Sequence, residues 1–327
     1  MRKINGVPIE ASTDLSELTG GEVFKWSGTG VVLEDQDETG LVPDPITRGL
    51  FAGGGTESDV KLDTIQYITI ATAGNSVDFG NLTTATKLLG ACADATRGLF
   101  GGGINASTVN TIEYVTIAAA GNATDFGDLS VARYGVTACS DSTRGVFGGG
   151  NTGAVSDVID YITIQTTGNA TDFGNLTVAR NYLASCADAT LGVFGGGNTA
   201  TDTIDYVTIQ TTGNATDFGN LPVAKYNLGA CADSTRGVFG GGYGSSAVDT
   251  MEYITIQTTG NTTDFGDLTT VRYSLSACAD STRGVFGGGM YPRVNTIEYI
   301  TIQTTGNATD FGDLLTTTVQ SSACSGA

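Results

Sequence analysis

Side chains that could carry chemistry recur at equivalent positions along this chain. Cys and Asp stand two residues apart five times, as in Cys139 and Asp141, and thiolate and carboxylate groups both bind metal ions. The triplet Asp-Phe-Gly, which binds magnesium in protein kinases, occurs six times. The cysteines could form disulfides or a metal ring, and the aspartates could surround a cation such as Ca²⁺. The residues are Cys92, Cys139, Cys186, Cys231, Cys278 and Cys324, with Asp94, Asp141, Asp188, Asp233 and Asp280.

Simpler structural roles account for the same residues. Each Cys lies within a predicted strand among Ala and Ser, where a small buried side chain is expected, and equivalent Cys in separate repeats should be too far apart for a disulfide. The Asp-Phe-Gly triplets lack the other kinase motifs. Each Asp, such as Asp94 three residues before Arg97, is expected to cap a turn and to pair with that Arg. We predict no catalytic residue, no metal and no cofactor, with an Asp-lined cation site as the alternative.

The composition restricts the function further. None of the 327 residues is His, so the chain itself cannot form a His-containing triad or a His-ligated zinc site. The formal charge of −19 disfavours nucleic acid and anionic membranes as partners. A membrane span needs about 18 consecutive apolar residues, and the sequence contains no such run. The first residues lack the apolar stretch of a signal peptide.

Four landmarks repeat in a fixed order: a Phe before a glycine run, a Tyr in an apolar stretch, a Phe after Asp, and a Cys. The Tyr and the second Phe are 12 residues apart in all six copies, and that Phe and the Cys are 13 apart. The Cys and the next glycine-run Phe are 8 apart in all five places where both occur. Only the connection from the glycine-run Phe to the Tyr varies, between 12 and 16 residues. This connection is therefore the part of the repeat that is free to change.

Each copy predicts four short strands. "RGVFGGG", "TIEYITI", "TDFGDL" and "YSLSACA" are rich in β-branched, aromatic or small residues, and "TTGNAT" predicts a Gly-Asn turn between the second and third strands. Four strands in about 47 residues favour a propeller blade. The first copy lacks a Cys strand before it and the last copy ends with one, so a strand near residues 316–326 should complete the blade begun by residues 47–82. We predict an all-β, six-bladed β-propeller of four-stranded antiparallel blades at 47–327, closed by the C-terminal strand, after a short β-rich segment at 1–46.

The order of the landmarks resembles the kelch repeat. The family pattern of a diglycine, a Tyr, a Trp-x-x-Leu and an Arg is matched here by Gly148–Gly150, Tyr161, Phe173 with Leu176, and Arg180. The chain departs from that pattern in having Phe in place of Trp and in its uniform Cys. The resemblance covers residues 47–327 and implies a propeller that binds through its loops rather than a particular reaction.

A set of basic residues opens the Cys strand and should share a face with the variable connections. These cations could form an anion-binding rim for carboxylates or acidic sugars around a channel. Alternatively, they pair with acidic strand neighbours such as Glu113 or Glu252, which we favour. The residues are Lys87, Arg133, Arg180, Lys225 and Arg272.

The variable connections are candidates for a binding surface, because a rigid scaffold with one variable face is how many recognition sites are built. The last two, "YGSSAVD" and "MYPRVN", bring aromatic and basic side chains to adjacent blades. The predicted ligand-binding residues are Tyr243, Met290, Tyr291 and Arg293.

Tandem copies rich in Gly, Thr and Asn resemble the kelch-type propellers of bacteriophage tail fibres and other virion proteins. The resemblance implies a non-enzymatic virion protein, made in the host cytoplasm and part of a larger oligomeric assembly. Residues 1–46 would attach to other virion proteins, and the loops would bind a host surface glycan or protein. A capsid decoration protein is the nearest alternative. A carbohydrate-active propeller enzyme would need paired carboxylates in a pocket. Intracellular kelch adaptors commonly carry helical partner domains, for which the repeats leave no room in this sequence.

Overall fold

The structure, a computed structural model, describes residues 48–198 and 201–326, together with the backbone of four short strands near the N-terminus. The chain divides into two units, Met1–Asp44 and Pro45–Ala327. In the first unit β1 (Lys3–Ile4) pairs with β2 (Val7–Pro8), and β3 (Val23–Trp26) pairs with β4 (Val31–Glu34), both antiparallel. The second pair contains Trp26, which lies opposite Val31. The predicted attachment role of residues 1–46 lies outside the described residues.

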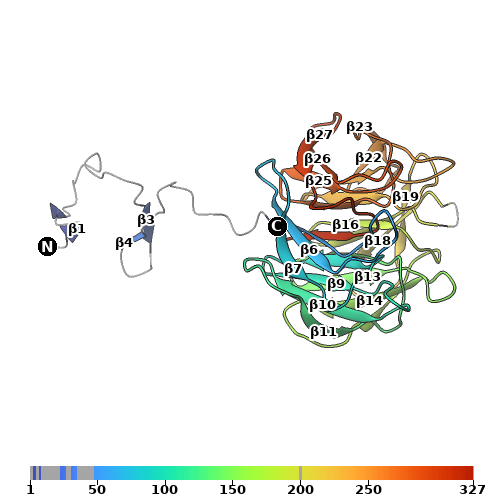
Figure 1. The fold of residues 1–327 in the computed structure, drawn as a ribbon, viewed down its shortest axis with the longest axis horizontal. Coiled ribbons are helices and arrows are strands. Elements are labelled where there is room, and N and C mark those ends of the chain that lie inside the picture. Colours follow the sequence, from blue (N-terminus) through green and yellow to red (C-terminus); the bar gives the residue numbers. More distant parts are fainter. Residues whose placement is uncertain are drawn as a thin grey trace. The chain divides into compact units, whose positions relative to one another are not determined.

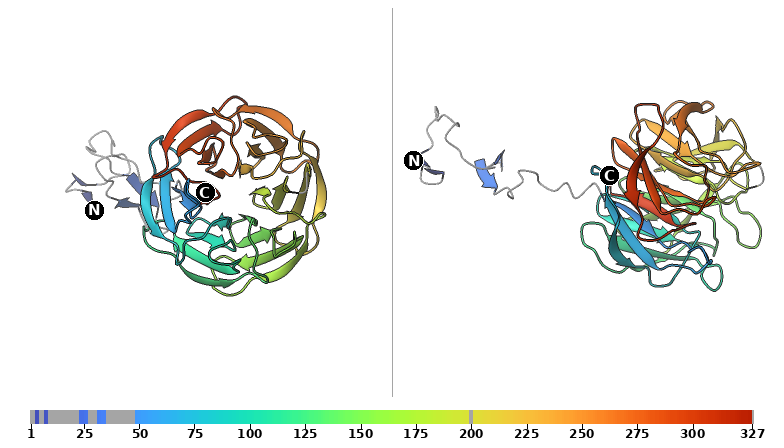
Figure 2. Two further views of the ribbon diagram at one scale, coloured as in Figure 1. Left: turned by 45° about the vertical axis from the view of Figure 1, so that its right-hand side comes forward. Right: turned by 45° about the horizontal axis from the view of Figure 1, so that its top comes forward.

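The second unit is a six-bladed β-propeller, as the repeat predicts. Six four-stranded antiparallel sheets form a closed ring, and the described residues contain no helix (Figures 1 and 2). The Cys strands β8, β12, β16, β20, β24 and β28 contact one another in succession around the ring and form its innermost layer.

We number the blades along the chain and give the strands of each from the inside outwards. Blade 1 comprises β28 (Ser322–Ser325), β5 (Arg48–Ala52), β6 (Thr64–Thr69) and β7 (Val77–Asn81). Blade 2 comprises β8 (Gly90–Ala93), β9 (Arg97–Gly101), β10 (Thr111–Thr116) and β11 (Thr124–Asp128). Blade 3 comprises β12 (Thr137–Ser140), β13 (Arg144–Gly148), β14 (Val158–Thr163) and β15 (Thr171–Asn175). Blade 4 comprises β16 (Ala184–Ala187), β17 (Leu191–Gly195), β18 (Thr203–Thr208) and β19 (Thr216–Asn220). Blade 5 comprises β20 (Gly229–Ala232), β21 (Arg236–Gly240), β22 (Thr250–Thr255) and β23 (Thr263–Asp267). Blade 6 comprises β24 (Ser276–Ala279), β25 (Arg283–Gly287), β26 (Thr296–Thr301) and β27 (Thr309–Asp313).

The C-terminal strand closes the ring. β28 pairs antiparallel with β5, with Ser322 opposite Ala52 and Cys324 opposite Leu50, so blade 1 is built from both ends of the propeller sequence. This confirms the predicted closure. The strand itself is shorter than the predicted 316–326, because the residues before Ser322 belong to the connection from β27.

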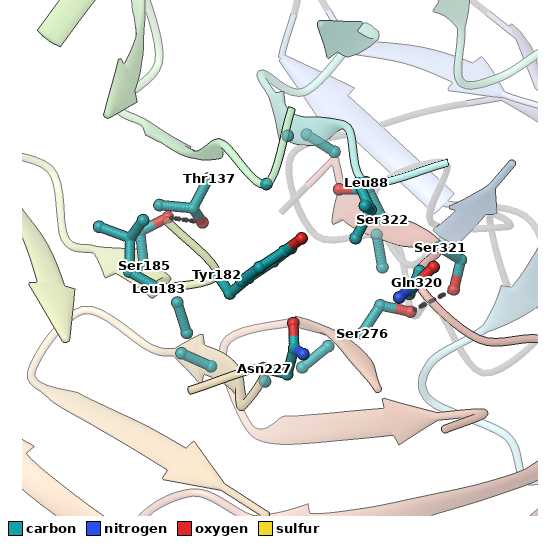
Figure 3. Close-up of a pocket in the computed structure, with 18 of the residues that line it drawn as sticks. Leu88, Thr137, Tyr182, Leu183, Ser185, Asn227, Ser276, Gln320, Ser321 and Ser322 are labelled. Atoms are coloured by element: carbon teal, nitrogen blue, oxygen red, sulfur yellow. Dashed lines mark hydrogen bonds between the residues drawn. The ribbon is translucent and has the colours of Figure 1, made fainter. Parts of the chain in front are cut away.

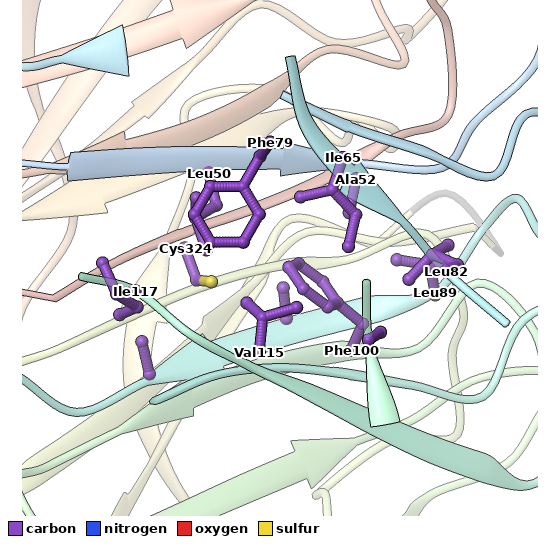
Figure 4. Packing of buried hydrophobic residues seen from close by; sticks show 13 residues of the cluster. Leu50, Ala52, Ile65, Phe79, Leu82, Leu89, Phe100, Val115, Ile117 and Cys324 are labelled. Atoms are coloured by element: carbon purple, nitrogen blue, oxygen red, sulfur yellow. The ribbon is translucent and has the colours of Figure 1, made fainter. Parts of the chain in front are cut away.

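The hydrophobic core lies between neighbouring blades. In five of the six blades the glycine-run Phe lies over the last glycine of the preceding blade's second strand, as Phe194 does over Gly148, where a Cβ atom would stand 2.7 Å from the ring. Blade 1 has Ala52 in place of this glycine. Figure 4 shows the cluster between blades 1 and 2, in which Phe100 packs with Leu50, Phe79 and Val115. The recurrent Phe and Gly are therefore complementary parts of one interface.

The six cysteines are core residues, as predicted. All six are free and buried. Burial raises the pKa of every one of these thiols, for Cys186 and Cys324 to about 12, so they remain protonated at neutral pH and are poor nucleophiles or metal ligands.

The repeated Gly-Asn turn connects each blade to the preceding one. The backbone N–H of Gly168 donates to the Phe126 carbonyl at 2.8 Å, and the Asn169 side-chain oxygen accepts from the Asp128 N–H at 3.1 Å. The corresponding Asn bond recurs at all six blade boundaries. It gives the outermost strand a partner, and an unpaired strand edge is a site for aggregation. The Gly-Asn pair, which is present in all six copies, therefore helps to join neighbouring blades.

Candidate functional site

The variable connections all leave the glycine runs on one face of the propeller, which we call the loop face. Two successive glycines with positive φ, such as Gly149 at +68° and Gly150 at +112°, carry the chain out of the second strand. The first loop residue then bridges to the segment before the inner strand, as Asn151 does with Tyr134. The loops and the predicted cation segments therefore share a face, as the strand order indicates.

The predicted ligand-binding residues lie on this face, and two of them, Tyr243 and Met290, contact Tyr273. Tyr243 is half-buried and contacts Tyr273 edge-on, with 5.1 Å between ring centroids, while Met290 bridges to the backbone of Tyr273. Tyr291 is 67% exposed. Arg293 is tied to the neighbouring loop, since its guanidinium donates to the Thr56 carbonyl at 2.8 Å.

A continuous series of tyrosines follows the loop face across blades 3 to 6. Neighbouring rings in this tyrosine arc are 5.1 to 6.4 Å apart between centroids. Sequence reasoning singled out only Tyr243. The signal for the others was present, because Tyr follows the basic residue directly in three copies. The arc consists of Tyr134, Tyr182, Tyr226, Tyr243 and Tyr273.

The arc borders a cavity of about 110 Å³ at the loop-face end of the central channel. Figure 3 shows Tyr182 pointing into this cavity, with Asn227 and Gln320 among the residues around it. The Ser274 hydroxyl, which lines the same cavity, is buried and has no hydrogen-bond partner. Burial is the main reason that the pKa of Tyr182 rises to about 12, so its phenol stays neutral and can donate a hydrogen bond.

Six residues with positive φ form the entrance to this cavity. Each backbone N–H donates to the carbonyl of the equivalent residue in the preceding blade at 2.7 to 3.0 Å, so the six hydrogen bonds form a closed ring. Because only the backbone takes part, the side chains at these positions are free to differ. The residues are Leu88, Gly135, Tyr182, Asn227, Ser274 and Gln320.

The predicted cations do not form an accessible anion-binding rim. Four are buried beneath the loop face and paired with an acid of the third strand in their own blade, as Arg133 is with Asp160 at 2.9 Å. A charge buried in such a pair cannot contact a ligand in solution. The other pairs are Arg180–Asp205, Lys225–Glu252 and Arg272–Glu298.

Lys87 differs from the other four cations. It lies five residues before Cys92, whereas Arg133 lies six before Cys139, so the equivalent of Arg133 in blade 2 is Thr86. Lys87 pairs near the surface with Asp59, which is 68% exposed in its side chain, and this Lys lowers the pKa of that carboxyl. The expected pairing was right for Glu252, but among the described residues Glu113 has no basic partner.

Glu113 should reduce stability at neutral pH. Its pKa is raised, mainly by burial, so the folded protein holds the proton more tightly than the unfolded chain does. The stability that this group contributes is present below its unfolded pKa and is lost as the pH rises. We therefore expect Glu113→Gln to have a higher urea midpoint than the parent at pH 7 and the same midpoint at pH 4 or below. Gln66 already occupies the equivalent position in blade 1. An unchanged midpoint at pH 7 would show that ionised Glu113 costs nothing.

The opposite end of the channel holds a cavity of about 440 Å³ lined by the repeated Asp and Ser residues. The aspartates cap turns here, as predicted: Asp141 Oδ1 accepts from the backbone N–H groups of Thr143 and Arg144 at 2.7 and 2.8 Å. Its other oxygen accepts from Gln210 of the next blade at 2.6 Å. Burial alone would raise the pKa of Asp141, but these hydrogen bonds outweigh it and lower the pKa. In residues 48–198 and 201–326, no three His, Cys, Asp or Glu residues are grouped so as to hold a metal ion.

The expected Asp–Arg ion pair across each turn is wrong. The Arg97 guanidinium instead lies over the Tyr114 ring, 4.7 Å from its centroid, and donates to the Ile164 carbonyl of blade 3 at 3.0 Å. The turn holds the Asp through backbone N–H groups, which leaves the Arg side chain free to join two blades. Arg48, Arg144, Arg236 and Arg283 make the same kind of contact with a Tyr ring.

Comparison of the chain with protein-family models and with curated proteins gives no match. Within the part of the chain that the structure describes, no helix is long and apolar enough to span a membrane.

Proposed function

We propose that this chain is a non-enzymatic binding protein that recognises its ligand with the loop face of the propeller. The observation that carries this proposal is the tyrosine arc beside the channel cavity. Tyr side chains combine a large apolar surface with a polar group and lose little conformational freedom on binding, so they are common at recognition surfaces. The arc lies on the face that bears all the length variation of the repeat, where binding specificity can change without altering the blades.

The ligand that best suits this surface is a neutral glycan on a host surface. The charges nearest the arc are already paired, since Arg180 and Lys225 are buried with their acids and Arg293 is bound to a backbone carbonyl. Tyrosine rings, together with amide groups such as that of Asn227, can contact both the C–H faces and the hydroxyls of a sugar. A host surface protein is the alternative ligand.

The kelch-like order of residues and the uniformity of the copies support a finer proposal, that the chain belongs to a bacteriophage virion as a tail-fibre or other receptor-binding component. Residues 1–46 would attach it to other virion proteins within an oligomeric assembly. A capsid decoration protein is the second candidate. Mass spectrometry of purified virions tests both, because absence of the chain from the particles would contradict either role.

An array of neutral and acidic surface oligosaccharides, followed by analysis of the bound sugars, tests the binding role. The proposal expects saturable binding to neutral glycans with no change in the sugar chain. Cleavage of the bound sugar would instead show a carbohydrate-active enzyme. Binding confined to protein extracts would identify a protein ligand.

Truncating one ring of the arc should abolish most of the glycan binding. We expect Tyr226→Ala to weaken binding about 30-fold, which corresponds to the roughly 2 kcal/mol lost at a central aromatic contact. Tyr226→Phe keeps the contacts of Tyr226 with Tyr182 and Tyr243, at 6.4 and 5.7 Å between centroids, and should retain most of the affinity. Titration calorimetry with the array-selected sugar measures both variants. Wild-type affinity in Tyr226→Ala would exclude the arc as the binding surface.

A further inference from the structure

Blade 2 departs from the other blades at a buried position below the loop face. In blade 3 the Arg133 guanidinium has three partners: the Val158 carbonyl at 2.6 Å, the Phe147 carbonyl at 3.2 Å and the Asp160 carboxylate at 2.9 Å. Blades 4, 5 and 6 place Arg or Lys at the same position, each paired with a buried acid. Blade 2 has Thr86 at this position and keeps the acid, as Glu113.

The shorter Thr86 side chain leaves a cavity of about 50 Å³ in blade 2. Thr111, Phe100 and Glu113 line it, and these are the equivalents of Val158, Phe147 and Asp160. The same three groups that hold a guanidinium in blade 3 therefore surround a cavity in blade 2.

The Glu113 carboxylate is only 8% exposed and lacks a basic partner among the described residues. Thr83 donates to it through both its backbone N–H and its hydroxyl, as Thr269 does to Glu298 in blade 6. In blade 6, however, Arg272 neutralises the acid, with 3.2 Å between the two groups. Blade 1, which also lacks the cation, has the neutral Gln66 in place of the acid. Among the described residues, blade 2 is therefore the one blade with a buried carboxylate at this position of the third strand and no basic partner for it.

We propose that the blade 2 cavity binds one guanidinium group from outside the chain. The guanidinium would pair with Glu113 and donate to the carbonyls of Phe100 and Thr111, as Arg133 does in blade 3. Exposed Thr83 and Thr84 and half-buried Asn105 also line the cavity, so it can be reached from the loop face. A planar group with several N–H donors satisfies a carboxylate and nearby carbonyls together, which a spherical cation cannot do. This site is separate from the tyrosine arc and does not depend on the proposed glycan ligand.

Titration calorimetry of the whole chain with methylguanidinium at millimolar concentrations tests the proposal, with tetramethylammonium, which has no N–H donor, as the control cation. We expect saturable binding of one methylguanidinium per chain and none of tetramethylammonium. Thr86→Arg should abolish binding, since it supplies the guanidinium internally. Glu113→Gln should weaken binding at least tenfold. Both variants carry residues that other blades have at these positions, so both should fold.

Arg272→Thr provides a matched gain of function. It places a Thr beside Glu298 and Thr296, which are the blade 6 equivalents of Glu113 and Thr111. A second equivalent of methylguanidinium should therefore bind. The blocked tripeptide Gly-Arg-Gly distinguishes the source of the group: binding of the tripeptide at the Thr86 site indicates an arginine side chain of a partner protein, whereas binding of methylguanidinium alone indicates a small free guanidine. Absence of saturable binding to the parent, or equal binding to Thr86→Arg, would overturn the proposal.

Discussion

Arg180→Thr is expected to lower the free energy of unfolding by about 3–5 kcal/mol, the usual cost of leaving one member of a buried ion pair without its partner. Arg180 and Asp205 are both fully buried and lie 2.9 Å apart. Removing the cation leaves the Asp205 carboxylate in the protein interior, where Thr177 still donates to it but cannot neutralise its charge. Urea titration followed by circular dichroism measures the loss.

Replacing both members should recover most of that stability. Blade 1 carries Thr318 and Gln66 at the equivalent positions, so the chain already contains a neutral version of this pair. The double variant Arg180→Thr with Asp205→Gln should therefore be more stable than Arg180→Thr alone. If the double variant were as unstable as the single one, packing of the Arg stem rather than the unpaired charge would explain the loss.

The ring of six blades could be predicted because the spacings between the landmark residues are constant from copy to copy. The 12, 13 and 8 residues between successive landmarks correspond to pairs of strands joined by turns of fixed length. A closed ring requires every blade to be nearly the same, and near-identity is visible in one sequence. The missing Cys strand before residue 47 and the additional one at Cys324 then implied how the ring closes.

The candidate site was harder to predict, because it depends on what differs between copies. Lys87 was grouped with Arg133 by its charge, although counting from the Cys places Thr86 there, and this error concealed the unpaired Glu113. The entrance ring had no signal in the sequence. Leu88, Tyr182 and Gln320 have no side-chain property in common, since the hydrogen bonds that align them belong to the backbone.

Contacts between blades were also invisible in the sequence, because their partners lie on different repeats. The Gly that follows Arg at the start of the second strand resembles a residue with no special role. In the structure this Gly faces the Cys sulfur of the preceding blade, as Gly237 faces Cys186. A residue chosen for what a neighbouring blade presents cannot be recognised from its own strand.

Gly237→Ala should therefore lower the free energy of unfolding by about 1–3 kcal/mol, the usual cost of forcing an extra methyl group into a packed core. The new Cβ atom would stand 2.6 Å from Cys186 Sγ, well inside van der Waals contact. Gly121→Ala is the matched control, since its Cβ would meet no atom within 4 Å. The urea midpoint of Gly237→Ala should be lower than that of Gly121→Ala.

Removing the sulfur should relieve this clash. In the double variant Gly237→Ala with Cys186→Ala, the nearest remaining atom to the new Cβ is Ile254 Cγ1 at 3.3 Å, which a small side-chain shift can accommodate. The two substitutions should then cost less together than the sum of their separate effects. If the costs of the two substitutions were strictly additive, Gly237 would be required by its own strand. The packing of Cys against Gly between blades would then no longer explain why the two residues recur together in every repeat.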